Sequence, residues 1–475
     1  MSGMRLSRKL VGLALPLVTA TTALSSVPAD AGPTRQAPCA RVGVVTVPGA
    51  EVQKAACLAD LTTAGTVASG HTNVDDWNGL HAAGTTNPND WAGLNAAGTR
   101  NPSGVPGIQV DGYFPDTSTT NSNNGWKHDS QFVVRLPDDW NGRLVVSGAP
   151  GTRRQYANDF IISDWVLAQG YAFASTDKGN SGAAFYRDGS APGGSVREWH
   201  HRVTQLTKAT KRVVEQRYGK APRRTYMFGI SNGGYLTRWQ IENRPGLYDG
   251  GLDWEGTLLR ADGPNLMTYL PAALRNYPAY AATGDEAAHD AMIDAGFAPG
   301  SEFLWPFHHA YYWDLTQRIY REELDPGYDG ALDAGVPFCG SGTPSCDADY
   351  DYASRPDSVK DAVRSVQLTG DIGRKLITVH GTLDTLLPPA TSSDVYTALV
   401  DRRGLDRRHR YYQVEDGTHV DGLYPAYPDR LRPLLPCARA AFTALTRWVE
   451  KGSEPPADGF YARPETGDLL DTCEL

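Results

Sequence analysis

The stretch that decides the fold is Thr225-Tyr226-Met227-Phe228-Gly229-Ile230-Ser231-Asn232-Gly233-Gly234. A short apolar, β-prone run leads into a Gly-x-Ser-x-Gly pattern, and a helix-compatible stretch follows from Tyr235 to Glu242. A tight turn between strand and helix needs small residues beside the serine, because its strained backbone leaves the hydroxyl exposed. The helix start favours developing negative charge. We therefore interpret Ser231 as a nucleophile, although a glycine-rich turn with an incidental serine looks similar.

Two later segments offer the base and the acid that such a serine needs. Leu376–Val379 is an apolar run before a turn that ends in Asp384, and Arg410–Val414 precedes a loop that ends in His419. Both groups follow strands directly, where ligands bind in open α/β sheets. The chain order Ser, Asp, His is the order of α/β-hydrolases. We predict that His419 takes the proton of Ser231 and that Asp384 orients the imidazole.

Other acidic and histidine side chains near these segments are weaker candidates. His380 lies in the turn that presents Asp384, and we expect it to brace that turn. Asp416 or Asp421 are alternatives to Asp384 as the acid, although Asp416 is too close to His419 in sequence for easy convergence of the side chains.

An oxyanion hole needs two backbone N–H donors. The first is predicted at Asn232, the residue after the nucleophile. The second is predicted in the loop after the Arg143–Val146 run, where Pro150 has no N–H to donate. Gly151 is the choice, with Ala149 or Thr152 as alternatives.

From about residue 126 the chain alternates apolar runs with helical patterns, which predicts a doubly wound, mostly parallel sheet of the α/β class. Residues 137–142 have the composition of a hairpin turn between two such runs. The predicted strands are Phe132–Leu136, Arg143–Val146, Tyr171–Ser175, Thr225–Phe228, Leu376–Val379 and Arg410–Val414, with helices at Phe160–Gln169 and from Val203 to about Arg217.

The rhythm breaks between residues 263 and 370, a stretch rich in Pro, Asp and aromatic residues. We interpret it as a lid inserted between two halves of the core, residues 126–262 and 371–475. Eight aromatic side chains crowd into 26 residues there: Phe303, Trp305, Phe307, Tyr311, Tyr312, Trp313, Tyr320 and Tyr328. We expect most of them to pack a small core, and some to line an acyl pocket.

An N-terminal extension, residues 32–125, is rich in Gly, Asn, Thr and Ala and contains a two-copy repeat. Asp76–Thr85 recurs as Asp90–Thr99, each copy with one Trp. Two copies are too few for a solenoid. We favour two turns that dock their Trp side chains on the main domain over a polymer-gripping surface.

Residues 1–31 read as an export signal, because a basic start precedes the apolar run Leu10–Leu24 and the small-x-small site Ala29–Ala31. We therefore predict a secreted protein. The chain's net charge is -9, which argues against nucleic-acid binding. No later segment is long and apolar enough to predict a membrane span. The six cysteines of an exported chain are expected to pair locally, as Cys39–Cys57, Cys339–Cys346 and Cys437–Cys473.

Several of these segments resemble the bacterial 3-hydroxybutyrate-oligomer hydrolases. The resemblance lies in Leu136–Arg143, Ser175–Gly179, Ile230–Gly234 and Arg410–Asp421. Thr176–Gly182 and His380–Asp384 are also similar to the tannase and feruloyl esterase family. That family joins its serine and histidine segments by a disulfide, whereas this chain has Ile230 and Val420 at those positions. The difference favours the hydroxyalkanoate hydrolases.

The tannase resemblance also raises the question of calcium in the lid. Oxygen-rich clusters suit that ion, but solvated acidic loops are commoner, so we predict no metal and no cofactor. The six candidate acids are Asp325, Asp329, Asp333, Asp347, Asp349 and Asp351.

Together these features predict a secreted serine-dependent carboxylic-ester hydrolase that acts on hydroxyalkanoate oligomers or a related polyester. The alternatives are a feruloyl- or tannin-type aryl esterase, a secreted peptidase, and a catalytically silent hydrolase fold that binds polymer. Retention of Ser, Asp and His in order argues against the silent version.

Overall fold

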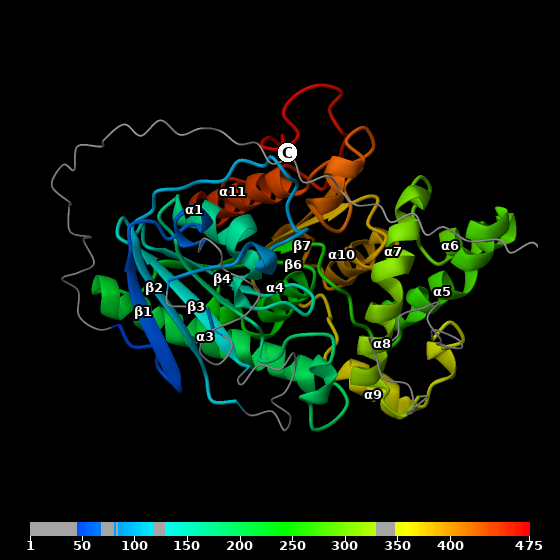
Figure 1. Cartoon of the computed structure of the whole chain (residues 1–475), viewed down its shortest axis with the longest axis horizontal. Coiled ribbons are helices and arrows are strands. Elements are labelled where there is room, and N and C mark those ends of the chain that lie inside the picture. The colour runs from blue at the N-terminus through cyan, green and yellow to red at the C-terminus, as the bar shows by residue number, and fades with distance from the viewer. Residues whose placement is uncertain (1–44, 68–79, 82–83, 117–128, 329–346) are drawn as a thin grey trace, which may run out of the picture. The chain divides into compact units, whose positions relative to one another are not determined.

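The computed structural model describes residues 45–67, 80–81, 84–116, 129–328 and 347–475. Its centre is a ten-stranded sheet flanked by helices (Figure 1). The strands are β1 (Val52–Leu58), β2 (Gly107–Tyr113), β3 (Gln131–Pro137), β4 (Arg143–Gly148), β5 (Ala172–Thr176), β6 (Arg224–Ile230), β7 (Gly250–Trp254), β8 (Lys375–Gly381), β9 (His409–Val414) and β10 (Gly459–Tyr461).

The order of strands across the sheet is β1-β2-β3-β5-β4-β6-β7-β8-β9-β10. The seven strands β5, β4, β6, β7, β8, β9 and β10 run parallel to one another, whereas β1, β2 and β3 pair antiparallel at one side and β3 is antiparallel to β5. The carboxyl ends of the parallel strands therefore meet at one edge, where the loops after β4, β6, β8 and β9 converge. The predicted α/β class with a mostly parallel sheet is confirmed.

The predicted hairpin across residues 137–142 is wrong. β3 and β4 are not neighbours, because β5 lies between them and pairs with both. The connecting segment instead meets the turn before β5, where the Asn141 N–H donates to the Gly170 carbonyl at 2.8 Å. Turn-forming residues indicate that a chain reverses, but they do not indicate which strand it pairs with next.

The pleat of the sheet sends alternate side chains into two cores, because successive residues of a strand point to opposite faces. Leu144 and Val146 pack on one face, with α3 (Gly194–Tyr218) and α4 (Asn232–Asn243). Val145, from the same strand, packs on the other face with α11 (Leu435–Lys451). The short α2 (Asp164–Leu167) lies in the core with α11, and α10 (Ser393–Arg402) in the core with α3.

A helical insertion follows β7 and precedes β8, and it lies to one side of the sheet in Figure 1. Trp305 and Trp313 have no exposed surface and belong to the core that also contains α3. Of the other six predicted aromatic residues, Tyr320 is buried in the same core, Tyr311 is exposed, and the remaining four are half-buried. The helices of the insertion are α5 (Leu266–Thr283), α6 (Glu286–Asp294), α7 (Trp305–Tyr311), α8 (Trp313–Leu324) and α9 (Asp357–Arg364).

The described parts of the N-terminal extension join the same sheet. β1 and β2 continue it beyond β3, and the short helix α1 (Thr63–Thr66) follows β1. Trp91, from the second copy of the repeat, is buried in the core that contains α11. That copy therefore docks on the main domain, whereas Trp77 of the first copy lies outside the described residues.

The structure contains the predicted Cys437–Cys473 disulfide, with 4.9 Å between the two Cα atoms. It ties α11 to the C-terminal segment. Cys57 is also disulfide-bonded, but its predicted partner Cys39 and the predicted pair Cys339–Cys346 lie outside the described residues.

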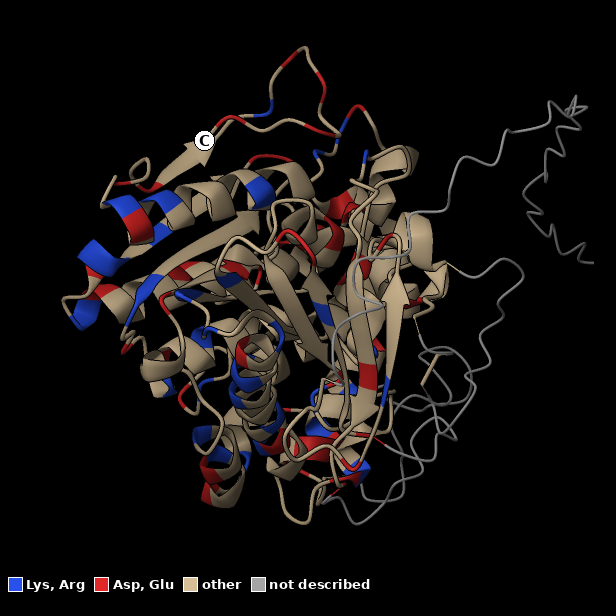
Figure 2. Cartoon of the chain, turned by 90° about the vertical axis from the view of Figure 1, so that its left-hand side faces the viewer, with Lys and Arg blue, Asp and Glu red and all other residues tan. Residues whose placement is uncertain are grey.

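Acidic and basic side chains are mixed along the helices and loops rather than separated on different sides of the view in Figure 2. Within the described ranges, no helix is long and apolar enough to cross a membrane. The predicted export signal lies outside those ranges.

Candidate active site

Ser231 lies at the turn between β6 and α4, with φ +57°. This left-handed conformation is uncommon for a residue with a side chain, and such strain concentrates at functional sites. The flanking glycines are required by space. A Cβ on Gly229 would lie 2.2 Å from the Gly233 carbonyl oxygen, and a Cβ on Gly233 would lie 2.6 Å from that of Gly148. The Gly-x-Ser-x-Gly pattern is thus the only one that fits this tight approach.

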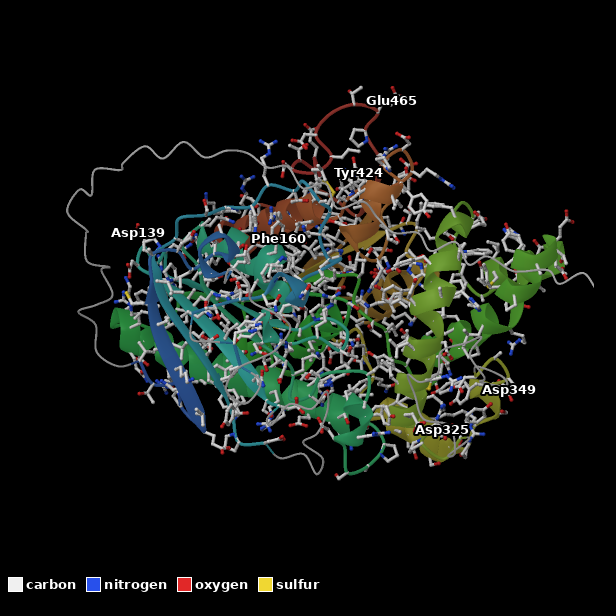
Figure 3. The ribbon with its side chains drawn as sticks, viewed as in Figure 1. Asp139, Phe160, Asp325, Asp349, Tyr424 and Glu465 are labelled. Atoms are coloured by element: carbon white, nitrogen blue, oxygen red, sulfur yellow. A yellow bond between two sulfur atoms is a disulfide. The ribbon has the colours of Figure 1, made fainter. Side chains whose placement is uncertain are left out.

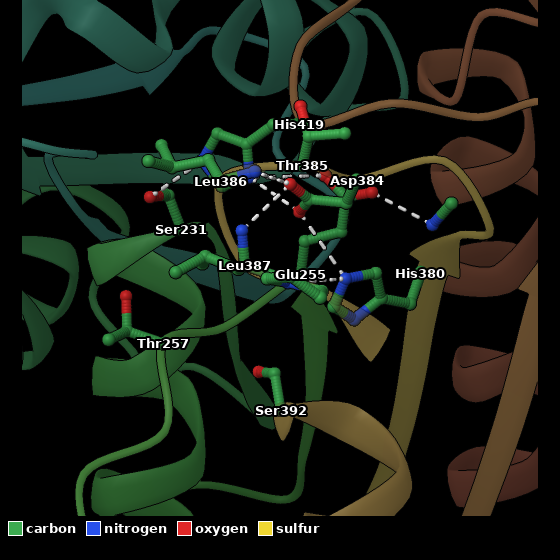
Figure 4. A network of polar contacts seen from close by, with 12 residues as sticks. Ser231, Glu255, Thr257, His380, Asp384, Thr385, Leu386, Leu387, Ser392 and His419 are labelled. Carbon is green, nitrogen blue, oxygen red and sulfur yellow. Dashed lines mark hydrogen bonds and ion pairs between the residues drawn. The ribbon is translucent and has the colours of Figure 1, made fainter. Parts of the chain in front are cut away.

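The structure brings the three residues singled out in the sequence into one hydrogen-bonded chain (Figure 4). His419 Nε2 lies 3.1 Å from Ser231 Oγ, and His419 Nδ1 lies 2.7 Å from Asp384 Oδ2. His419 and Asp384 are buried. A neutral imidazole with its proton on Nδ1 leaves Nε2 free to accept the serine proton, which is the geometry that general-base activation requires.

Asp384 is held as a buried carboxylate by the turn in which it lies. Its Oδ1 accepts hydrogen bonds from the N–H groups of Leu386 and Leu387, at 2.8 and 2.9 Å. His380 Nε2 lies 3.3 Å from its Oδ2. Burial works to raise the pKa of Asp384, but His419 and His380 outweigh it and hold the pKa well below its usual range. An ionised acid can stabilise the imidazolium that forms during acyl transfer.

The two rival acids have other partners. Asp421 accepts from the N–H groups of Leu434 and Leu435, at 2.7 and 2.9 Å, and so caps the start of α11. Asp416 lies at a turn with φ +59°, and its carboxylate is 4.0 Å from Arg463. Asp384 alone of these three carboxylates has a hydrogen bond to His419 among the described residues.

Glu255 is a site residue that sequence reasoning missed. It follows β7, is fully buried, and its Oε2 lies 3.8 Å from His419 Nδ1. Its Oε1 accepts from the Gly381 N–H at 2.8 Å. Burial and the negative charge of Asp384 raise the pKa of Glu255 well above its usual range, so this acid is neutral beside an ionised one. The strand before it already contains Asp253, so no local sequence pattern distinguished Glu255 from the other acids of the chain.

The two predicted oxyanion donors lie at the same place. The Asn232 side-chain amide donates to the Gly151 carbonyl at 3.1 Å, and its Oδ1 accepts from Thr257 Oγ1 at 3.0 Å. The alternative Ala149 is occupied, because its N–H donates to the Thr176 carbonyl at 2.9 Å. Gly151 and Thr152 therefore remain as candidates for the second donor.

A cavity of about 250 Å³ opens beside Ser231. The loop after β4, the insertion and the segments around Ser231 and His419 all contribute to it. Its lining is mostly aliphatic, with a few polar groups near the serine, as ligand pockets usually are. The lining includes Leu94, Leu266, Leu315, Ile319, Leu386, Leu387 and Val420, together with Gly151, Thr152, Arg153, Tyr312 and Tyr320.

Of the acids proposed for calcium, Asp325 and Asp349 lie in the insertion (Figure 3). Asp325 forms an ion pair with Arg355 at 2.6 Å, and Asp347 forms one with Arg321 at 2.8 Å. These acids are thus neutralised by arginines. Asp329 and Asp333 lie outside the described residues. Within the described part of the chain, the one group spaced closely enough for a metal is Glu255, His380 and Asp384, beside the serine.

Comparison with known proteins gives a family match over part of the chain and likenesses to solved esterase structures. Residues 116–254 match the family "Tannase and feruloyl esterase". The solved structure of an esterase from Aspergillus oryzae superposes with a TM-score of 0.51 at 15% identity, over 86% of this chain and 88% of that one. The chain has the α/β-hydrolase fold. The structure of tannin acyl hydrolase from Aspergillus niger has a TM-score of 0.49 at 15% identity, over 77% of this chain and 82% of that one.

This α/β-hydrolase also has a curated relative, mono(2-hydroxyethyl) terephthalate hydrolase of Piscinibacter sakaiensis. The two are 28% identical over 143 residues, which is 27% of this chain and 23% of the relative. The match therefore spans about a quarter of that protein's length. The family and the relative both bear out the predicted enzyme class, a carboxylic-ester hydrolase, and the family match lies on the tannase and feruloyl esterase side of the predicted resemblance.

Proposed function

We propose that Ser231, His419 and Asp384 are the catalytic triad of a serine esterase, with the N–H groups of Asn232 and Gly151 as its oxyanion hole. The observation that carries the proposal is the continuous hydrogen-bonded chain from Ser231 Oγ through His419 to Asp384, at the wall of an apolar cavity. A base within hydrogen-bond distance of a hydroxyl, with an ionised acid behind the base, is the arrangement that acyl transfer needs.

The proposed reaction has two halves. Ser231 Oγ attacks the ester carbonyl carbon while His419 Nε2 takes its proton, and the carbonyl oxygen becomes the oxyanion. His419 then gives that proton to the leaving alcohol as the C–O bond breaks, which leaves an acyl-serine. In the second half, water attacks the acyl carbon while His419 takes a proton from it, and His419 then gives that proton to Ser231 Oγ as the acyl–serine bond breaks and the acid is released. Ionised Asp384 stabilises the imidazolium in both halves.

For the substrate, we propose short hydroxyalkanoate oligomers such as those of 3-hydroxybutyrate. The cavity volume of about 250 Å³ lies below the usual range of roughly 300–1,000 Å³ for ligand pockets. That size favours a small acyl group, and seven Leu and Ile side chains line the cavity. Ile230 and Val420 line the same cavity, where the tannase resemblance implies a cysteine pair.

An aryl esterase of the feruloyl or tannin type is the second candidate. The observation that favours it is the family match over residues 116–254, supported by Tyr312 and Tyr320 in the cavity wall. Aromatic rings prefer offset or edge-to-face contacts with other rings. These two side chains offer such contacts to an aromatic acid.

We also propose that residues 1–31 direct secretion, that residues 32–125 form an extension of the core, and that residues 263–370 act as the lid. The cavity supports the last assignment, since Tyr312, Leu315 and Ile319 from the insertion face the space beside Ser231.

A side-by-side measurement of kcat/KM on 3-hydroxybutyrate trimer and methyl ferulate tests the substrate. We expect the trimer to be preferred. Because one methylene in an apolar pocket changes discrimination by only about 1–3 kcal/mol, related aliphatic esters should react within roughly two orders of magnitude. A clear preference for the ferulate would replace the first candidate by the second. If the protein cleaved neither compound, the result would point to the silent, polymer-binding alternative.

A further inference from the structure

Arg153 is a cation in the wall of a cavity that has no acid. It lies two residues after Gly151 and lines the same space as Ser231. Among the described residues that line this cavity there is no Asp or Glu, and His419 is the other side chain there that can carry positive charge. A substrate entering this site therefore meets a fixed positive charge without a protein counter-ion.

Arg153 is held by neutral groups. Its Nη1 donates to the Asp90 carbonyl at 3.0 Å and its Nη2 donates to the Ala92 carbonyl at 2.8 Å. Both carbonyls belong to the second copy of the Trp repeat, so the docked repeat fixes the position of the guanidinium. In the described part of the chain, no carboxylate lies within ion-pair distance of Arg153.

The adjacent residue shows what a structural arginine looks like here. Arg154 forms an ion pair with the Asp90 carboxylate at 2.7 Å, and that carboxylate also meets His81 at 2.6 Å. The same short segment thus neutralises one arginine with its side chain and supports the other only with its backbone. Burial lowers the pKa of Arg153, opposed by Tyr312 and Asp90, yet a guanidinium stays protonated at neutral pH.

We propose that Arg153 binds a free carboxylate of the ester substrate, so that the enzyme selects esters that also carry an acid group. This rests on the proposed esterase function and narrows its substrate class. A guanidinium is the side chain best suited to a carboxylate, because its N–H groups match the two oxygens and the pair is stronger than a neutral hydrogen bond. Hydroxyacid oligomers with a free terminal carboxylate belong to this class, and fully esterified acids do not.

Two matched pairs of substrates separate charge from shape. In the first pair, 4-nitrophenyl hydrogen adipate and its methyl ester differ only in a carboxylate on the acyl side. In the second pair, 3-hydroxybutyrate dimer and its methyl ester differ in a carboxylate on the alcohol side. The measurement is kcat/KM for cleavage of the 4-nitrophenyl ester or of the internal ester by the wild type, Arg153→Gln and Arg153→Lys.

Arg153→Gln keeps a donor for the Asp90 and Ala92 carbonyls but removes the charge. We expect kcat/KM for the acid-bearing ester of at least one pair to fall about 10- to 100-fold, the range for a hydrogen bond to a charged group. The matching methyl ester should change less than about threefold, and Arg153→Lys should lie between wild type and Arg153→Gln. Arg212→Gln, on the exposed side of α3, is the control and should leave both ratios unchanged.

An equal fall for both members of each pair would mean that Arg153 only supports the cavity wall, and it would overturn the proposal. A wild type without any preference for the acid-bearing members would overturn it as well. In either case the methyl esters would still be cleaved, so the proposed esterase function would stand.

Discussion

The two walls of the cavity beside Ser231 are built in different ways. The sheet wall carries the reacting polar groups, which are placed directly after β6, β8 and β9 and held by short hydrogen bonds in a buried network, beside apolar side chains such as Leu386 and Val420. The insertion wall consists of apolar side chains from α8, held mainly by packing, with Tyr312 beside them. The reacting groups are therefore fixed by backbone geometry. The fit to the substrate is set by the side chains of the insertion wall, which can be substituted without disturbing the reacting groups.

The two walls are linked at few points. Tyr320 donates from its hydroxyl to Asn232 Oδ1 at 2.5 Å, and Trp313 Nε1 donates to the Thr385 carbonyl at 2.7 Å. Substitutions on each wall therefore separate chemistry from fit.

The largest effect is expected from Asp384→Asn on the sheet wall. The amide cannot hold His419 in the tautomer that accepts the serine proton, so kcat should fall about 10⁴-fold. Steady-state kinetics at pH 7 checks this. The matched control is Asp421→Asn, which leaves one acceptor oxygen for the Leu434 and Leu435 N–H groups at the start of α11, and it should lower the melting temperature while kcat stays within about threefold. If the two variants exchanged these effects, Asp421 would be the acid.

An intermediate effect is expected from Tyr320→Phe, which removes the hydrogen bond from the insertion to Asn232. The loss of one hydrogen bond, worth about 0.5–1.5 kcal/mol, should lower kcat roughly 2- to 10-fold, because Asn232 loses a partner that positions its backbone N–H. Tyr312→Phe on the same wall is the control and should alter KM rather than kcat. An unchanged kcat in Tyr320→Phe would show that the insertion does not help to position Asn232.

The smallest effect on turnover is expected from Glu255→Gln. Because the pKa of Glu255 is raised, the folded protein holds a neutral acid there and an amide is a close replacement. Turnover should stay within about threefold of the wild type, in contrast to Asp384→Asn.

Stability should respond to pH in this variant. Above the unfolded pKa of Glu255 the unfolded chain releases a proton that the folded chain keeps, so Glu255 makes the wild type less stable as pH rises toward the folded pKa. Glu255→Gln removes this loss. Its melting temperature relative to the wild type should therefore rise from pH 5 to pH 8. A difference that falls over this range would mean that Glu255 is ionised in the folded protein.

Much of the sheet wall was predictable because its signals are local. The glycines around Ser231 mark a turn that only small residues fit, and the apolar runs before Asp384 and His419 mark strands whose ends share one edge. The predicted fold class followed from the same alternation of strands and helices.

The rest depends on contacts between distant segments. The false hairpin arose because the neighbour of β3 is β5, which comes later in the chain and is not encoded in the turn. Glu255 can be recognised as a site residue only from its position beside Asp384 and His380, which are more than 120 residues away in the sequence. Ala149 is excluded as the second oxyanion donor because its N–H donates to the Thr176 carbonyl, and this contact between neighbouring strands cannot be seen in the sequence.

The most direct test of the central claim is to treat the purified protein with a fluorophosphonate and map the modified peptide by mass spectrometry. Only a serine activated by a neighbouring base reacts rapidly with such a probe. We predict stoichiometric labelling at Ser231 that parallels the loss of ester hydrolysis, and neither labelling nor hydrolysis in a folded Ser231→Ala variant. Labelling at another serine, or full hydrolytic activity in Ser231→Ala, would contradict the account.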